Sequence, residues 1–452
     1  MEDTTASPLQ SALLTALTQQ ISQMVTTLSV WVQAAPRTLA DLEARILPLA
    51  QTVGQALLTG ACQLLDAGPS VRSQPCACGA QATYQRQRGA TVRTVLGTVT
   101  IARAYYHCAT CGQGQAPLDQ QLGYCAGSTS AGLDELLALV GALADSFEEA
   151  ATLLGKLTLV QVCPNLARTA TERLGTQLQA CQEVTRASAW EDGTLPLAVS
   201  PPARLYLSLD GVLVHTDDGW REYKLGTAYT TRTRPDKDHP GELEVVAQEQ
   251  TYIGDLVDAA TIGQLWWCEA ARRGALEAKE LVVVADGAHW IWDLVAEHFP
   301  DATQIVDWYH ASGYIWQVAH ASYGEGSDLG KRWAKKRLDE LWAGQVPAVL
   351  AAFACKTAHG KAVAEAITYF TNQQARMHYA DYRARGLQIG SGTMESSCKQ
   401  IITARLKQAG MIWSINGARA VATVRAWLKS GRWQEAIALR PPRRRTYQRR
   451  AA

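Results

Sequence analysis

The chain has 452 residues, and its 43 basic and 42 acidic side chains leave a formal net charge of +1. This length allows about three domains with a large core, and the balanced charge favours no class of partner for the chain as a whole. The first residues, MEDTTASPLQ, are too polar for a signal peptide, and no apolar run of about 18 residues could span a bilayer, so we expect a cytoplasmic protein with no membrane partner.

Residues 1–70 are expected to form two or three helices. Leu17, Ile21 and Met24 belong to an apolar pattern with helical spacing, which Ala-Ala-Pro at 34–36 interrupts. The segment has few basic residues, so we interpret it as a packing or dimerisation element in preference to one that contacts DNA.

Residues 71–125 are expected to form a small β module that binds a metal ion. Eleven cysteines in a cytoplasmic chain argue against a disulfide framework, and two pairs of them stand in CACG and CATCG, separated by alternating β-branched residues. A hairpin would bring both glycine-tailed turns around a tetrahedral Zn²⁺, whereas unrelated free thiols are the alternative. The expected ligands of this structural, zinc-ribbon-like site are Cys76, Cys78, Cys108 and Cys111, with His107 as the substitute should Cys76 fail.

Residues 126–191 return to a helical pattern. Breaks at Gly155 and Pro164 separate the candidate helices SFEEAATLLGKL and PNLARTATERLG. Two short helices joined by a turn are compatible with a DNA-binding helix-turn-helix, although most such pairs only pack together. The low-complexity segment 192–203 is the expected domain boundary.

Residues 204–310 predict three consecutive strands, followed by helix, strand, helix and strand. This order is typical of a ribonuclease-H-like α/β fold, in which helices flank a mixed sheet. Asp210 is expected at the end of the first strand, in LYLSLDGVLVH, and Asp286 at the end of the fourth, LVVVADG. The two strands are neighbours in that fold, so the carboxylates would repel one another unless divalent ions ligated by oxygen hold them together.

Each of these aspartates has a simpler explanation, because Asp-Gly after a strand is often only a turn. The metal site is favoured by the pair of acids in this element order together with a third acid, Glu395, in GSGTMESSCKQ. A helix that starts at 391–393 places Glu395 in its first turn and Lys399 one turn later on the same face. A glutamate in a first turn is by itself more often a capping residue.

The order of these motifs resembles that of bacterial insertion-sequence DDE transposases, most closely the Kra-type family and more distantly the Mutator-like superfamily. The matching stretches cover nearly all of residues 76–433: CACG, CATCG, LGTVTIARAYYHC, PLDQQLGY, SLDGVLV, VADGAHWIW, DWYH and GSGTMESSCKQIITARLKQAGMIWS. The resemblance implies a multidomain α+β protein whose catalytic triad, Asp210, Asp286 and Glu395, binds two Mg²⁺ or Mn²⁺ ions.

The resemblance also implies a role for Asp307 and His310 in DWYH, the signature that follows the second catalytic acid in Mutator-like enzymes. Asp307 also ends a strand and competes with Asp286 as a ligand. We expect Asp286 to be the ligand, because its strand is the fourth in order, and the DWYH residues to support the site or contact DNA. For His310 a satisfied histidine at a helix start is the structural alternative.

Two further parts of the catalytic core are implied, an all-helical insertion over residues 311–385 and the last helices over 386–433. The insertion contains KRWAKKR, which interleaves an aromatic residue with cations as surfaces for DNA ends do, although a solvated helix face explains it equally well. The tail, 434–452, is either a phosphate-binding tail or a disordered solubilising end. The candidate DNA-binding residues are Lys331, Arg332, Trp333, Lys335, Lys336, Arg337, Lys399, Arg405, Lys407, Arg419, Arg443, Arg444 and Arg445.

These inferences predict a zinc-containing DDE transposase that cleaves insertion-sequence ends and transfers the strands to target DNA by a two-metal mechanism. Its partner would be double-stranded DNA, both the inverted repeats and the target, bound by a homodimer or higher oligomer at the bacterial nucleoid. Two other classes stay open: a ribonuclease-H-like nuclease without strand transfer, and a non-catalytic DNA-binding protein derived from a transposase. The three intact carboxylates count against the second class.

Overall fold

The computed structural model describes residues 8–66, 68–125, 127–194, 200–235, 243–356 and 360–440 of a mixed α and β protein with two compact units. Unit 1 comprises residues 1–170 and 440–452, and unit 2 comprises residues 171–439. The division falls within helix α6 (Pro164–Glu191) and not at 192–203, where we expected it. None of the helices in the described ranges is long and apolar enough to cross a membrane.

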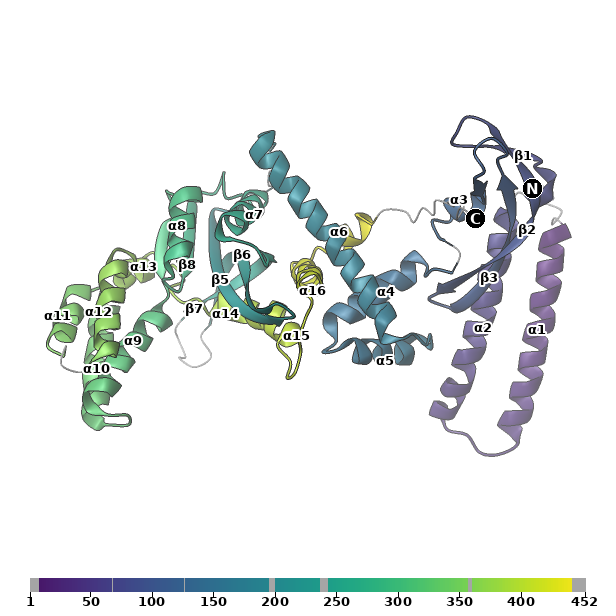
Figure 1. Ribbon diagram of the computed structural model, residues 1–452. Helices are drawn as coiled ribbons and strands as arrows, with labels where there is room; N and C mark the ends of the chain where they lie inside the picture. Colours follow the sequence, from purple (N-terminus) through teal and green to yellow (C-terminus); the bar gives the residue numbers. More distant parts are fainter. Residues whose placement is uncertain are drawn as a thin grey trace. The chain divides into compact units, whose positions relative to one another are not determined.

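Unit 1 begins with a helical hairpin made of α1 (Pro8–Gln33) and α2 (Leu39–Leu65), as expected for the first 70 residues (Figure 1). A capping box fixes the start of α2, because Thr38 and Asp41 each accept a hydrogen bond from the backbone N–H of the other. The start of α1 packs against the end of α2, where a Cβ atom added to Gly60 would lie 2.4 Å from Leu13 Cδ1. The two helices are therefore antiparallel and closely packed at this end.

A four-stranded antiparallel sheet with the order β1-β2-β3-β4 follows the hairpin. Its strands are β1 (Ser73–Pro75), β2 (Gln81–Thr94), β3 (Gly97–His107) and β4 (Gly114–Gln115). On the next element, α3 (Pro117–Gln121), Asp119 pairs with the buried Arg103 at 2.6 Å. Helices α4 (Ala131–Leu143) and α5 (Phe147–Thr158) bury a second apolar core with the start of α6.

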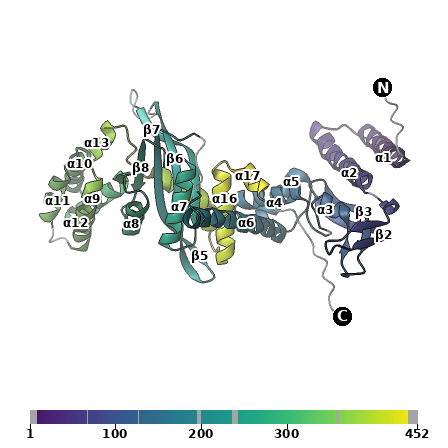
Figure 2. The same cartoon turned by 90° about the horizontal axis from the view of Figure 1, so that it is seen from above.

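Unit 2 contains a five-stranded mixed sheet with the order β7-β6-β5-β8-β9 (Figures 1 and 2). The first three strands form an antiparallel meander: β5 (Arg204–Thr216), β6 (Gly219–Pro235) and β7 (Leu243–Asp255). The two others, β8 (Glu280–Ala285) and β9 (Thr303–Val306), are parallel to β5 and follow the connecting helices α7 (Ala259–Arg272) and α8 (His289–His298). The aliphatic run of β8 is buried, as expected for a central parallel strand.

The chain between β9 and the last helices is entirely helical in its described residues, as predicted. Its helices are α9 (Trp308–Tyr323), α10 (Asp328–Trp342), α11 (Val346–Ala354), α12 (Lys361–Gln373) and α13 (Tyr379–Ala384), with a 3-10 turn at Gln374–Arg376. They share one apolar core with the sheet, and Figures 1 and 2 show them grouped beyond β8 and α8. Tyr379 donates a hydrogen bond to the carbonyl of Val306 at 3.0 Å, which fastens α13 to β9.

The last helices of unit 2 return the chain to the sheet. They are α14 (Gly392–Cys398), a π-helical turn (Lys399–Thr403), α15 (Ala404–Leu406), α16 (Ile415–Lys429) and α17 (Trp433–Ala438). The second half of α6 belongs to this unit because Gln179 donates to Thr423 Oγ1 of α16 at 3.3 Å and Arg186 donates to Gln264 of α7 at 2.5 Å.

Candidate functional site

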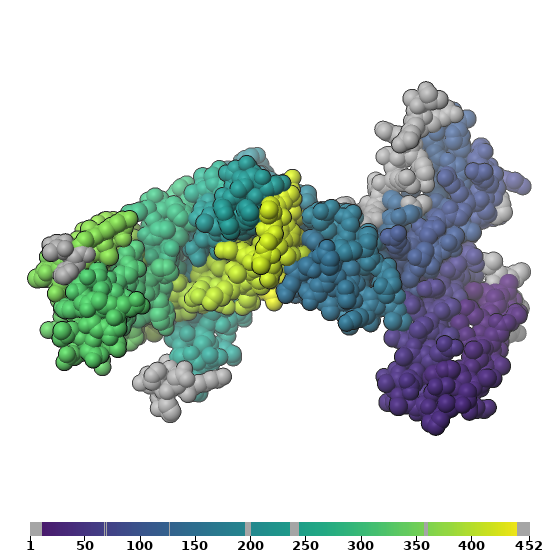
Figure 3. Space-filling view, turned by 60° about the horizontal axis from the view of Figure 1, so that its bottom comes forward, coloured from purple at the N-terminus to yellow at the C-terminus, as the bar shows by residue number. Residues whose placement is uncertain are grey.

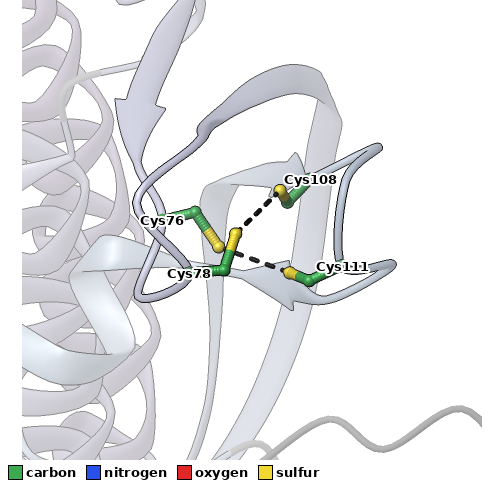
Figure 4. A group of neighbouring side chains, drawn as sticks. All are labelled: Cys76, Cys78, Cys108 and Cys111. Carbon is green, nitrogen blue, oxygen red and sulfur yellow. Dashed lines mark hydrogen bonds between the residues drawn. The ribbon is translucent and has the colours of Figure 1, made fainter.

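Four cysteines of unit 1 form a compact cluster at one end of the β2–β3 hairpin (Figure 4). The Sγ atoms of Cys76, Cys78, Cys108 and Cys111 all lie within 4.8 Å of one another. Two of the distances are 3.6 Å, between Cys76 and Cys111, and 3.7 Å, between Cys78 and Cys108. Four sulfurs bound tetrahedrally to Zn²⁺ at about 2.3 Å lie about 3.8 Å apart, so the cluster has the size of a structural zinc site.

The two cysteine turns have the same hydrogen-bond pattern although their spacings differ. In each turn the N–H of the first cysteine donates to the carbonyl of the residue after the glycine, from Cys76 to Ala80 at 2.8 Å and from Cys108 to Gln113 at 2.9 Å. The glycine N–H donates back to the carbonyl of the first cysteine at 2.9 Å in both turns. Both glycines, at 79 and 112, have positive φ values of 86° and 68°, which a residue with a side chain rarely adopts.

The cluster contains all four predicted ligands and does not include His107, the proposed substitute, which lies at the end of β3. A hydrogen bond from the backbone N–H of Cys111, opposed by burial, lowers the pKa of the Cys108 thiol to about 6. The pKa of Cys111 shifts the other way: a hydrogen bond from the backbone of Gln113 lowers it, but burial and hydrogen bonds with the other three cysteines raise it overall. The cluster thus favours one thiolate, at Cys108, near neutral pH. A closed set of four sulfurs leaves no open position for a substrate, so the site is suited to a structural role.

In unit 2, three aspartates lie at one level of adjacent parallel strands: Asp286 and Asp307 directly follow β8 and β9, whereas Asp210 lies within β5 and not at its end as expected. The strand continues past Asp210 because β5 pairs with β6 as far as Thr216. The register of β5 with β8 pairs Arg204 with Glu280, an offset of 76 residues that also separates Asp210 from Asp286. The register of β8 with β9 pairs Ala285 with Val306, and the same offset of 21 residues separates Asp286 from Asp307. The carboxyl edge of the sheet therefore carries three carboxylates in a row, and the expected neighbours, Asp210 and Asp286, are the first two.

These aspartates line one cavity of about 380 Å³ with His310, Glu395 and other residues of α9 and α14. A larger cavity of about 1240 Å³ lies at the opposite ends of β5 and β8. Its charged residues include Arg204 and Arg385, which both pair with Glu280 and so neutralise it. We place the candidate site in the smaller cavity because the acids converge there.

Asp210 is half-buried beside the Asp286 carboxylate and the Cys398 thiol. Burial raises the pKa of its carboxyl, and the Asp286 carboxylate raises it further. Its Oδ1 accepts the N–H of Gly211 at 2.7 Å, and its Oδ2 accepts the thiol of Cys398 at 3.6 Å. Cys398 was not predicted from the sequence, although it lies three residues after Glu395 and so on the same side of α14.

Asp286 lies in a loop whose backbone carbonyls accept hydrogen bonds from side chains of α12. Tyr369 donates its hydroxyl to the carbonyl of Asp286 at 2.7 Å, and Gln373 donates to the carbonyl of Gly287 at 2.9 Å. The Asp286 carboxylate itself accepts the N–H of Ala288 at 2.9 Å. Two side chains of the helical segment thus orient the loop while the carboxylate faces the cavity; neither was predicted, because they follow Asp286 by more than 80 residues.

Asp307 differs from Asp286 because hydrogen bonds occupy its carboxylate. Its Oδ1 accepts the N–H groups of Tyr309 and Ser391, at 3.1 and 2.9 Å, and its Oδ2 accepts the N–H and the Nδ1 of His310, at 3.2 and 2.8 Å. Asp307 caps α9 and joins it to the residue before α14. The Asp307 carboxylate is therefore already engaged by the protein, whereas the choice of Asp286 as ligand, with Asp307 and His310 in a supporting role, stays a prediction.

The pKa values of the Asp307–His310 pair shift in opposite directions. The hydrogen bond to Asp307 raises the pKa of His310, whereas the pKa of Asp307 is lowered because hydrogen bonds from His310 and Ser391 outweigh the opposing effect of its burial. The stabilisation from His310 is therefore fully present below its unfolded pKa of 6.5 and is lost as the pH rises through the raised value. That from Asp307 is present above 3.8 and is lost as the pH falls through the lowered value.

We therefore expect the imidazole of His310 to titrate above 6.5 in an NMR titration of the folded chain, and its pKa to fall in Asp307→Asn, because the charged partner is lost. His320, on the same helix, serves as the internal control. An unchanged His310 titration in the variant would contradict the assigned contact.

Glu395 lies in the first turn of α14, as predicted, and its side chain points into solvent at the edge of the cavity. Its Oε1 pairs with Lys399 Nζ at 2.7 Å, one turn later. In the described part of the chain, the cysteines are the one group with ligand atoms close enough to hold a metal ion, so the three acids share a cavity without forming such a group. An exposed ion pair of this kind costs little to break.

Comparison with known proteins does not assign the chain to a family. No family model matches the chain, and no curated protein sequence matches it significantly. The function must therefore be argued from the two sites themselves.

The predicted phosphate-binding residues separate into exposed and buried groups. On α10, Lys331, Arg332, Lys335 and Lys336 are exposed on one face. Trp333 stacks on Phe353 with 6.1 Å between ring centroids, and Arg337 pairs with Glu340 at 2.6 Å. Trp333 and Arg337 thus belong to the inner face of α10, which argues against their predicted contact with DNA.

Two further predictions of phosphate contact disagree with the structure. Arg405 is 1% exposed and lies over the Trp413 ring, at 5.0 Å from its centroid. Arg419 makes two 2.6 Å hydrogen bonds to the buried carboxylate of Asp255. Both cations stabilise the interior of unit 2, whereas Lys399 and Lys407 remain exposed candidates. The predicted contacts of Arg443, Arg444 and Arg445 lie outside the described residues.

Proposed function

We propose that the chain is a DDE-type DNA transposase of the insertion-sequence class. The observation that carries the proposal is the shared cavity of Asp210, Asp286 and Glu395, with the two aspartates at the same level of neighbouring parallel strands. Three carboxylates from distant parts of a chain have no packing reason to meet at a sheet edge, because like charges repel. They are the ligand set that phosphodiester chemistry with two metal ions requires.

The proposal includes a ribonuclease-H-like fold for the catalytic part of unit 2. It is supported by the strand order β7-β6-β5-β8-β9, with an antiparallel meander and two parallel strands joined by helices. The long helical segment between β9 and α14 fits the insertion expected between the second and third acids.

The donor set of the cavity fits two Mg²⁺ or Mn²⁺ ions. All candidate ligands are carboxylate oxygens, which these ions prefer. Burial and the nearby Asp286 carboxylate both raise the pKa of Asp210, and a bound cation would relieve the second effect. When bound, such ions activate an attacking oxygen and stabilise the leaving oxygen of the phosphodiester. Asp210 and Asp286 are the residues that would hold them, with Glu395 as the third ligand after it leaves Lys399.

The remaining residues of the cavity position the three acids. The Tyr369 and Gln373 contacts fix the backbone beneath Asp286, and the Asp307 contact with Ser391 fixes the start of the helix that carries Glu395. Cys398 donates to Asp210 and limits its rotation. The ring of His310 lies at the same cavity, where its cation suits a DNA phosphate.

In unit 1 we propose a structural Zn²⁺ held by the four cysteines. The sulfur distances, the closed ligand set and the matching turns support this assignment. The ion would stabilise the β module, since the short strands β1 and β4 have little core of their own.

The exposed basic face of α10 is the proposed contact for DNA phosphates. We expect Lys335→Gln to weaken DNA binding for all sequences and to lower the slope of log K against log salt by about 1, as expected for the loss of one phosphate contact. Fluorescence anisotropy over a salt series measures both effects. Lys279→Gln is the matched control, an exposed lysine at the opposite ends of the strands. Equal effects of the two substitutions would remove α10 from the DNA surface.

The proposed activity is tested with DNA that carries the inverted repeats flanking the source locus, incubated with Mg²⁺ or Mn²⁺. Cleavage at the repeat ends followed by joining of the freed 3′-hydroxyl to a second DNA supports a transposase. Cleavage without joining indicates a nuclease, and DNA binding without cleavage indicates a non-catalytic derivative. Either of those outcomes would overturn the proposal.

A further inference from the structure

The first helix of the chain carries an apolar stripe that no described residue covers. Leu14, Ile21, Val25 and Val32 are 40 to 68% exposed, and their spacings of seven, four and seven residues place them on one side of α1. A second set, including Leu17 and Met24, is partly buried and faces α2. The helix is thus apolar on two sides, of which α2 covers one.

The second helix carries a matching stripe. Leu39, Ile46, Leu57 and Leu64 are 41 to 71% exposed and recur at multiples of about 3.6 residues. On both helices the exposed stripe is rotated in the same sense, by roughly a quarter turn, from the residues that face the other helix. Because the helices are antiparallel, the two stripes lie on the same broad face of the hairpin.

The charges of α1 limit the kinds of partner that this face can bind. The 26 residues of α1 include no charged side chain, so the helix offers no cation to a DNA phosphate or to anionic lipid headgroups, as membrane-surface helices do. It also offers no charge that would select a different protein partner. Two copies of α1 therefore meet without like-charge repulsion, and the apolar stripe is matched by symmetry. On α2 the charged residues Asp41, Glu43 and Arg45 all lie in the first two turns, and the chain from Ile46 to Leu65 is uncharged.

We propose that the hairpins of two chains pack face to face into a four-helix bundle, so that the protein is a dimer before it meets DNA. The purple atoms of Figure 3 are the residues of this hairpin. A stable interface buries about 800 Å² per partner, and eight large aliphatic side chains at these exposures provide apolar area of that order. Heptad-like spacing is the pattern by which helices interlock in such bundles.

The test is the mass of the full-length protein in solution, measured by light scattering and sedimentation without DNA or divalent ions. The variants are Val25→Glu, on the exposed stripe, and Val30→Glu. The second is the control, because it makes the same substitution at a valine that is 67% exposed on the other side of α1. Wild type and Val30→Glu are expected at twice the mass of one chain. Val25→Glu is expected to be monomeric, because two carboxylates buried across the symmetry axis raise the dissociation constant by about 100-fold or more.

A monomeric wild-type protein, or a Val25→Glu variant that stays dimeric, would overturn the inference. Ile21→Glu gives a second, independent measurement on the same stripe. Unchanged helical circular dichroism in each variant shows that the hairpin is still folded. The measurement involves neither DNA cleavage nor metal ions, so its outcome is separate from that of the proposed function.

Discussion

Asp286→Asn is expected to lower the rate of metal-dependent DNA cleavage by about 10³-fold or more. The amide keeps the size of the side chain but removes a negative charge from the proposed ion site, and metal-bound charge stabilisation contributes several kcal/mol to such reactions. The fold should remain intact, because the contacts of α12 with this loop are made to backbone carbonyls. Single-turnover cleavage of labelled repeat DNA measures the rate.

Asp293→Asn is the matched control for Asp286→Asn, because Asp293 is an exposed aspartate on the helix that follows. Its cleavage rate should equal that of the wild type. Asp307→Asn should reduce activity less than Asp286→Asn, since Asp307 holds α9 and Ser391 together and is not among the proposed ligands. Full activity of Asp286→Asn combined with its loss in Asp307→Asn would move the second ligand one strand along.

Cys108→Ser is expected to abolish zinc binding and to unfold the β module of unit 1. Structural zinc sites contribute about 10 kcal/mol or more of apparent free energy, which exceeds the stability of a small sheet with two very short edge strands. Elemental analysis should give one zinc ion per wild-type chain and none in the variant. Limited proteolysis should cut the variant within residues 71–125.

Cys163→Ser is the control for this substitution, because Cys163 is exposed and lies outside the cluster. It should keep one zinc ion and the proteolytic pattern of the wild type. A zinc-free wild-type protein that resists proteolysis would rule out the structural role assigned to the metal.

The order of elements in unit 2 could be predicted because each strand has a recognisable local sequence pattern. The aliphatic run before Asp286 became β8, and the break after it became the start of α8. The candidate helix SFEEAATLLGKL is α5, but the break expected at Gly155 does not occur, because a glycine inside a helix costs only about 1 kcal/mol. The boundary at 192–203 failed for another reason, since the contact of Gln179 with Thr423 joins residues 244 apart in the chain.

Asp286 and Glu395 were predictable because Asp286 directly follows a strand and Glu395 lies in the first turn of a helix, whereas Asp210 proved to lie within β5. The exposure of the cations could not be predicted, because an arginine faces solvent only if no acidic or aromatic partner from a distant part of the sequence packs against it. Arg419 looked available until the structure paired it with Asp255, 164 residues earlier. Cys398 was overlooked for the same reason, since its partner, Asp210, is 188 residues away.

The hydrogen bonds from α12 to the loop after β8 limit how far this protein can be shortened. A chain that joined β9 directly to α14 would keep all five strands and the carboxylates of Asp210, Asp286 and Glu395. It would, however, leave the carbonyls of Asp286 and Gly287 without the Tyr369 and Gln373 donors. We therefore expect the smallest fragment with the proposed activity to include the helices from α9 to α13. In this protein the helical segment forms part of the wall of the candidate cavity.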